Sequence, residues 1–190
     1  LFNLLKDPKA EEIIVAILHD AVEDQYKKIA TESIDQYGRW GDDIFGDDSW
    51  QRIIANLYMN HTYGEQIGAM LSTICKPDYK RTVFQLSKKN LSLAEFQTQK
   101  NRLYLDYLRS TIDDEKVGYV KLADFITNAA DVDDIPDEYE DKRISIKNKY
   151  YDGFAVVLEK IKDPKFASRL KDPENLELLK AVLKEAFLRD

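Results

Sequence analysis

The chain has 190 residues, of which 44% are hydrophobic and 33% are charged, with only 7 glycines and 5 prolines. It is long enough to bury a core and poor in the turn residues that a many-stranded fold needs, which favours a single all-α domain. The net charge of -7 argues against binding to a nucleic-acid backbone, and no apolar run approaches the roughly 20 residues of a membrane span.

The first predicted helix runs from about Pro8 to about Asp24. Asp7 is expected to be its N-cap, because proline is favoured at the first helical position that follows. Apolar residues then recur at helical spacing. They are Ile13, Ala16, Ile17 and Ala21.

This helix carries the polar group His19, Asp20, Glu23 and Asp24. At 3.6 residues per turn, His19 and Glu23 share one face, as do Asp20 and Asp24, so we expect one compact cluster. Such a cluster suits a divalent metal and a water molecule. The alternative is a helix end in solvent, with Glu23 and Asp24 merely exposed, but the apolar neighbours favour burial.

The middle of the chain contains a predicted loop and two residues with chemical potential. Glycine and aspartate residues between 38 and 48 predict the loop. His61 stands between two amphipathic runs, where we prefer a solvated or capping role over a metal-binding one. Cys75 ends an apolar helix and is more simply a small buried hydrophobe than a nucleophile.

Further helices follow in the second half. Ser92 and Glu95 form a predicted capping box, residues 144–162 carry apolar side chains at helical spacing, and Asp172 with Pro173 opens a last helix. We expect about eight helices and no strand.

A second polar motif lies in the apolar helical segment 119–128. Asp124 and Asn128 are one turn apart and therefore share a face. A lone aspartate in such a helix is more often a cap or a satisfied hydrogen-bond acceptor. Two such helices in one small chain nevertheless suggest a shared site.

Both motifs carry a family resemblance. Leu-His-Asp-Ala-Val-Glu-Asp (18–24) and Lys-Leu-Ala-Asp-x-x-x-Asn (121–128) resemble the two signatures of the HD-domain metal phosphohydrolases, most closely the hydrolase domain of RelA/SpoT-type alarmone enzymes. Residues 63–76 are similar to that family's intervening helix. The resemblance thus spans about residues 5 to 130, and with it we expect one HD-type helical bundle over residues 1–190. It also implies a first histidine ligand upstream, with residues 1–5 as the tail of the helix that carries it.

The resemblance implies roles for the polar residues. His19, Asp20 and Asp124 match metal ligands. Glu23 and Asp24 match the acidic pair that activates water. Imidazole with carboxylates suits a divalent ion such as Mn²⁺, and one of the two acids would take the proton of the attacking water as general base.

Three residues are candidates for contact with the substrate. Asn128 matches a site asparagine of the family, and Lys76 and Arg143 lie in two local basic groups that suit a phosphate. Such a basic group is more often an ordinary solvated face than a binding site.

Three functions stay open from the sequence. The first is hydrolysis of a guanosine 3'-pyrophosphate alarmone, (p)ppGpp, to GDP or GTP and pyrophosphate. The second is an HD phosphohydrolase for another nucleotide, which Phe125 favours because the family tends to have a basic residue there. The third is a catalytically inactive HD-like domain that binds a nucleotide or a protein. The lack of a secretory apolar segment predicts a cytoplasmic protein, and the oligomeric state stays open.

Overall fold

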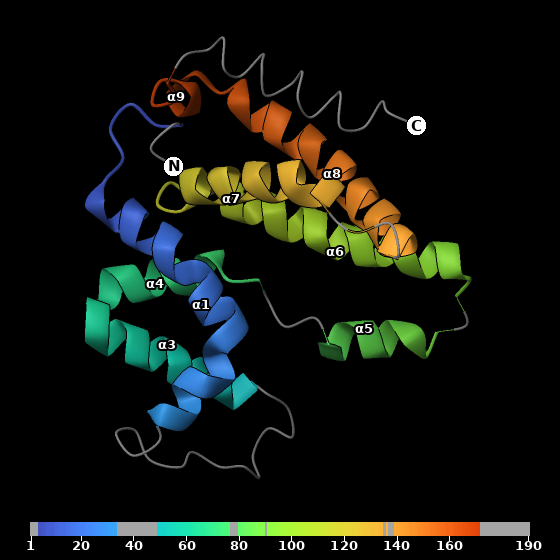
Figure 1. The fold of residues 1–190 in the computed structure, drawn as a ribbon, viewed down its shortest axis with the longest axis horizontal. Helices are drawn as coiled ribbons and strands as arrows, with labels where there is room; N and C mark the ends of the chain where they lie inside the picture. Colours follow the sequence, from blue (N-terminus) through green and yellow to red (C-terminus); the bar gives the residue numbers. More distant parts are fainter. Residues whose placement is uncertain are drawn as a thin grey trace. The chain divides into compact units, whose positions relative to one another are not determined.

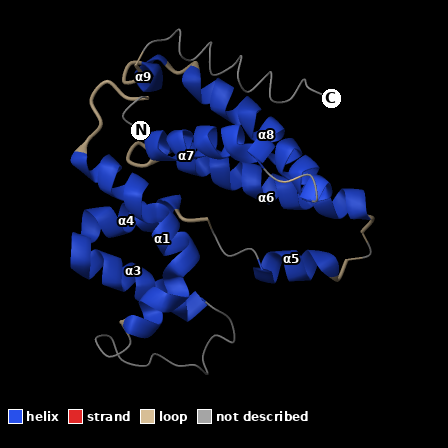
Figure 2. Cartoon of the chain, in the orientation of Figure 1, coloured by secondary structure: helices blue, strands red, loops and turns tan. Residues whose placement is uncertain are grey.

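The computed structural model describes residues 4–33, 49–76, 80–89, 91–134, 136 and 139–171. Apart from one isolated bridge, all regular secondary structure in these ranges is helical (Figure 2), which confirms the all-α prediction. No helix in this part of the chain is long and apolar enough to cross a membrane. The predicted loop at 38–48 and the predicted last helix from Asp172 lie outside the described residues.

The chain divides into two compact units. The N-terminal unit is Lys9–Lys80, and the C-terminal unit combines Leu1–Pro8 with Arg81–Asp190. The expectation of a single domain stays a prediction.

Three helices build the N-terminal unit. They are α1 (Ala10–Glu32), α3 (Ser49–Tyr63) and α4 (Glu65–Ile74), and each packs against the other two (Figure 1). The buried face of α1 differs from the predicted apolar stripe, since Ile17 is 71% exposed. The residues that α1 buries are spaced three and four apart and include a histidine. They are Glu12, Val15, His19, Val22, Tyr26 and Ala30.

The predicted bounds of α1 were wrong at both ends. The helix begins at Ala10 rather than Pro8, and its N-cap is Lys9, whose backbone N–H donates to Glu12 Oε2 over 2.8 Å. It continues to Glu32 rather than ending near Asp24, because buried residues recur at helical spacing beyond that point. Tertiary packing on both sides of the polar residues thus stabilises α1 as one continuous helix.

Gly64 makes the turn between α3 and α4. It has φ 89° and ψ 158° and is the N-cap of α4. Residues with a Cβ rarely adopt this backbone conformation, which only glycine enters easily. No heavy atom lies within 4 Å of the place where a Cβ would stand, so the requirement for glycine comes from the backbone alone.

Gly64→Ala should lower the free energy of unfolding by about 1–3 kcal/mol, the cost of forcing a Cβ into this conformation. Urea denaturation followed by circular dichroism measures the loss. Thr62→Ala, at an exposed position near the end of α3, is the control and should change stability by less than about 0.5 kcal/mol. Equal effects of the two substitutions would contradict the strained turn.

The C-terminal unit is built on three longer helices. These are α6 (Leu93–Asp113), α7 (Gly118–Ala130) and α8 (Glu140–Ile161), which lie side by side (Figure 1). The helices predicted within 119–128 and 144–162 are thereby confirmed. The short elements of this part of the chain are α5 (Lys80–Ser87), η1 (Asp131–Asp134) and α9 (Pro164–Ala167).

The predicted capping box at the start of α6 is confirmed. Ser92 Oγ accepts a hydrogen bond from the backbone N–H of Glu95, and the backbone N–H of Ser92 donates to Glu95 Oε2 over 2.8 Å. Hydrogen bonds from the Ser92 hydroxyl and backbone hold the pKa of the Glu95 carboxyl below its ordinary value.

Two close contacts bring separate segments of this unit together. Gly153 of α8 lies so close to α7 and α6 that a Cβ would stand 2.7 Å from the Phe125 ring and 3.0 Å from Leu108. Leu5 pairs with Leu170 in an isolated antiparallel bridge, and both side chains are buried. Leu5 is therefore not in the tail of a helix, as the sequence had suggested, because backbone hydrogen bonds tie this segment to residues 169–171.

Candidate functional site

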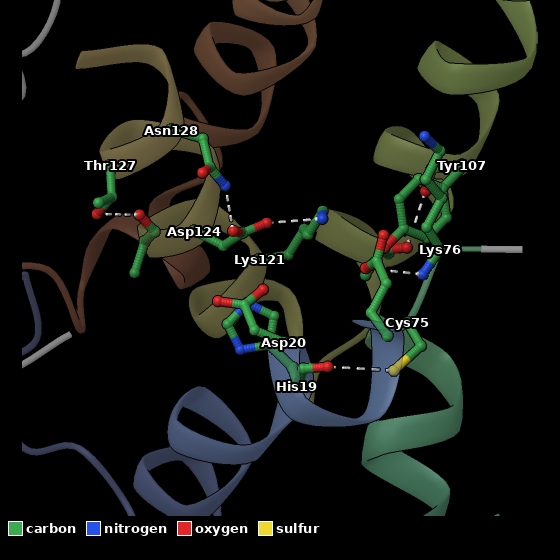
Figure 3. A network of polar contacts seen from close by, with 12 residues as sticks. His19, Asp20, Cys75, Lys76, Tyr107, Lys121, Asp124, Thr127 and Asn128 are labelled. Carbon is green, nitrogen blue, oxygen red and sulfur yellow. Dashed lines mark hydrogen bonds and ion pairs between the residues drawn. The ribbon is translucent and has the colours of Figure 1, made fainter. Parts of the chain in front are cut away.

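Helix α1 brings His19 and Asp20 into direct contact. The His19 side chain is buried, while Asp20 is exposed beside it. His19 Nδ1 lies 3.0 Å from the backbone carbonyl oxygen of Ala16, one turn earlier. Its Nε2 lies 3.2 Å from Asp20 Oδ1, and Figure 3 shows these two side chains beside each other. Both ring nitrogens therefore face oxygen atoms.

These two contacts limit the chemical state of the imidazole. A carbonyl oxygen only accepts hydrogen bonds, so Nδ1 carries a proton. Two states are then possible at Nε2. If Nε2 carries a second proton, the ring is positively charged and forms an ion pair with Asp20. If it does not, its lone pair faces the negatively charged Asp20 carboxylate. The second arrangement calls for a shared cation. A backbone carbonyl that fixes Nδ1–H and leaves Nε2 for coordination is the usual support of a metal-binding histidine.

The acidic pair that follows is split between two environments. Glu23 is half-buried, and its Oε2 accepts a hydrogen bond of 3.3 Å from the backbone N–H of Lys76 at the end of α4. Asp24 is exposed. The structure thus joins His19 to Asp20 and ties Glu23 to α4.

Asp124 of α7 is held by two neighbours on its own helix. Its Oδ2 lies 2.7 Å from Lys121 Nζ, and its Oδ1 accepts a hydrogen bond from the side-chain amide of Asn128 (Figure 3). The Lys121 and Asp124 side chains are only 8% and 11% exposed. The one-turn spacing from Asp124 to Asn128 is therefore a contact, as the sequence predicted.

Lys121 is the residue that sequence reasoning missed. Its Nζ also lies 4.9 Å from the centre of the Tyr107 ring, so the ammonium rests between a carboxylate and an aromatic face. The signal was available, because Lys121 is a cation in an apolar helix, three residues before Asp124. A buried lysine is costly without a partner, so Asp124 balances a charge of the core.

The remaining candidates lie apart from these contacts. Lys76 follows α4 and is exposed, and Arg143 is half-buried on α8. His61 is exposed in the last turn of α3, which agrees with the expected solvated role. Cys75 is half-buried. It is the C-cap of α4, and its Sγ donates to the carbonyl oxygen of His19 over 3.7 Å.

Phe125 explains one difference from the family pattern. Its side chain is buried and makes an edge-to-face contact with the Tyr150 ring, with 5.3 Å between the ring centres. This position therefore serves the core of the C-terminal unit.

The two motifs belong to different compact units. His19 and Asp20 lie in the N-terminal unit, and Asp124 and Asn128 lie in the C-terminal unit. That they share one metal stays a prediction from the sequence. Comparisons with family models, with characterised proteins and with solved structures found no match to the chain.

Asp124→Ala should lower the free energy of unfolding by about 3 kcal/mol, because it leaves the buried Lys121 ammonium without its carboxylate. The double substitution Lys121→Met/Asp124→Ala should recover a large part of this loss, since it removes the uncompensated charge. Chemical denaturation of both variants measures the difference.

The matched control is an exposed pair. Lys28 and Glu32 are 4.0 Å apart on α1, with side chains 70% and 68% exposed. Glu32→Ala should cost less than about 1 kcal/mol, because water solvates the lysine that remains. A double variant at 121 and 124 that is no more stable than Asp124→Ala would contradict the ion-pair account.

Proposed function

We propose that the chain is a metal-dependent phosphohydrolase whose metal ligands are His19, Asp20 and Asp124. The observation that carries this proposal is the pair of contacts at the His19 ring, with Nδ1 3.0 Å from the Ala16 carbonyl and Nε2 3.2 Å from Asp20 Oδ1. An imidazole fixed in this way beside a carboxylate fits a divalent cation.

The donor set suits a borderline or hard metal. One imidazole and two carboxylates favour Mn²⁺ or a similar ion over a structural zinc, which takes thiolates. When bound, such an ion polarises a phosphoryl group and lowers the pKa of a coordinated water.

The side chains around the ligands take the other tasks. Glu23 or Asp24 accepts the proton of the attacking water as general base. Glu23 is the better placed for a fixed geometry, because the Lys76 backbone N–H holds one of its carboxylate oxygens. Asn128 fixes Asp124 by donating to Oδ1 and thereby positions that carboxylate. Lys121 offsets its negative charge.

The substrate follows from the resemblance of the two motifs to RelA/SpoT-type hydrolase domains. We propose a cytoplasmic HD-type bundle of about eight helices that hydrolyses (p)ppGpp to GDP or GTP and pyrophosphate. Lys76, which is exposed, and Arg143, which is half-buried, would contact the phosphates of the nucleotide.

A second candidate is hydrolysis of another nucleotide. It is favoured by Phe125, which is buried in the core where the family tends to have a basic residue. A catalytically inactive nucleotide- or protein-binding domain is the third candidate.

The experiment incubates the full chain with Mn²⁺ and three substrate types: guanosine tetraphosphate, nucleoside triphosphates and nucleoside monophosphates. We expect pyrophosphate release from the tetraphosphate. Asp20→Asn and Asp124→Asn should each reduce the rate by about 100-fold or more, since a metal supplies several kcal/mol of stabilisation to the transition state.

Glu32→Gln is the control, because it removes an exposed acid from the same helix as Asp20. It should leave the rate unchanged. Hydrolysis of a different nucleotide would select the second candidate, and no turnover of any substrate would select the third. Full activity in both aspartate variants would overturn the metal site.

A further inference from the structure

A cavity of about 200 Å³ opens within the N-terminal unit, and we name it the Arg52 pocket. Val22 and Tyr26 of α1 are buried at its base. Arg52 and Asn56 of α3 line it with half-buried side chains. At its open end are Ser72 and Lys76, which are exposed, beside the half-buried Cys75. At roughly 30 Å³ per water molecule, the cavity has room for about six waters, or for one phosphate group with its first hydration contacts.

Arg52 is a half-buried cation, and no carboxylate among the residues that the structure describes forms an ion pair with it. Its guanidinium carbon lies 4.2 Å from the centre of the Tyr26 ring, and its Nη1 makes only a long contact of 3.4 Å with the Lys76 carbonyl oxygen. Its Nε is buried and has no hydrogen-bond partner in the described part of the chain. Within the described ranges, no ion pair reaches this side chain. A guanidinium stays charged at any physiological pH, so its partial burial is costly unless an anion completes it.

The other polar groups of the pocket are also loosely engaged. Asn56 Nδ2 and Ser72 Oγ are 3.4 Å apart, a distance at the weak limit of a hydrogen bond. Lys76 adds a second positive charge at the open end. Glu23 does not line the pocket, and its Oε2 accepts a hydrogen bond from the backbone N–H of Lys76. The lining therefore offers donors of three kinds, guanidinium, ammonium and neutral polar groups, which together suit an oxyanion.

We propose that the Arg52 pocket binds a small phosphate-class oxyanion, with Arg52 as its main charged contact and Lys76 as the second. Two sources share this chemistry: free inorganic phosphate and the phosphate group of a nucleotide. The pocket contains none of the proposed metal ligands. Lys76 is also a proposed phosphate contact of the nucleotide, whereas Arg52 and the pocket have no part in the proposed function. The inference therefore extends that function and does not rest on metal chemistry.

Cys75 provides a built-in reporter of occupancy. It is the only cysteine of the chain, it lines the pocket, and it is half-buried. The experiment measures the rate at which iodoacetamide, a small neutral reagent, alkylates this thiol. The full chain is used with EDTA present and ionic strength held constant with chloride. We expect inorganic phosphate to slow alkylation by about tenfold at about ten times its dissociation constant.

The arms of the experiment separate the two sources. Stronger protection by inorganic phosphate than by a nucleoside monophosphate supports a free anion, and the reverse order supports the phosphate group of a nucleotide. If neither slows the alkylation of the wild-type chain, the proposal is overturned. Because this result comes from the wild type, it does not depend on whether any variant folds.

Arg52→Met keeps the aliphatic stem and removes the charge, so it should abolish protection. Arg52→Lys keeps the positive charge but lacks the planar, forked guanidinium, so it should retain part of the protection. Arg102→Met, at an exposed position on α6, is the control for net charge and should leave protection intact. Undiminished protection in Arg52→Met would contradict the assignment. Asp20→Asn should keep full protection, so failure of the metal proposal and failure of this one are distinguishable.

Discussion

Burial of polar side chains on apolar helices is the constraint on which the rest of this structure depends. His19 on α1 and Lys121 on α7 both lie on buried faces, and each contacts polar groups of its own helix. Ala16 and Asp20 hold the His19 ring, while Asp124 compensates the Lys121 ammonium. Because an unpaired charge in the core would cost several kcal/mol, these local partners keep both motifs in fixed conformations.

Asp124 and Asp20 differ in how much each contributes to the stability of the fold. Asp124 balances a buried cation and accepts from Asn128, so its carboxylate is engaged on both oxygens. Asp20 is exposed, and its Oδ1 lies 3.2 Å from Nε2 of the His19 ring. Substitutions at Asp124 therefore combine a folding effect with any effect on a metal, whereas Asp20 reports on the site with little cost to the core. This difference makes Asp20 the more informative position.

The sequence predicted the helical class, the capping box at Ser92 and the contact between Asp124 and Asn128, because each depends on residues within one or two turns. It did not predict the buried face of α1, because packing against α3 and α4 sets that face and leaves Ile17 of the predicted apolar stripe exposed. The same limit applies to Leu5, whose backbone pairs with a residue far along the chain. The Arg52 pocket could not be predicted from local sequence patterns either, because residues of three helices line it.

A direct measurement of Mn²⁺ binding tests whether His19 and Asp20 form part of a metal site. Titration calorimetry at pH 8 would compare the wild-type chain with Asp20→Asn and with the exposed-acid control Glu32→Gln. The account predicts saturable binding in the wild type and the control, weakened by at least about tenfold in Asp20→Asn. Equal Mn²⁺ affinity in all three proteins would contradict it, and would leave the contact between His19 and Asp20 as a simple ion pair.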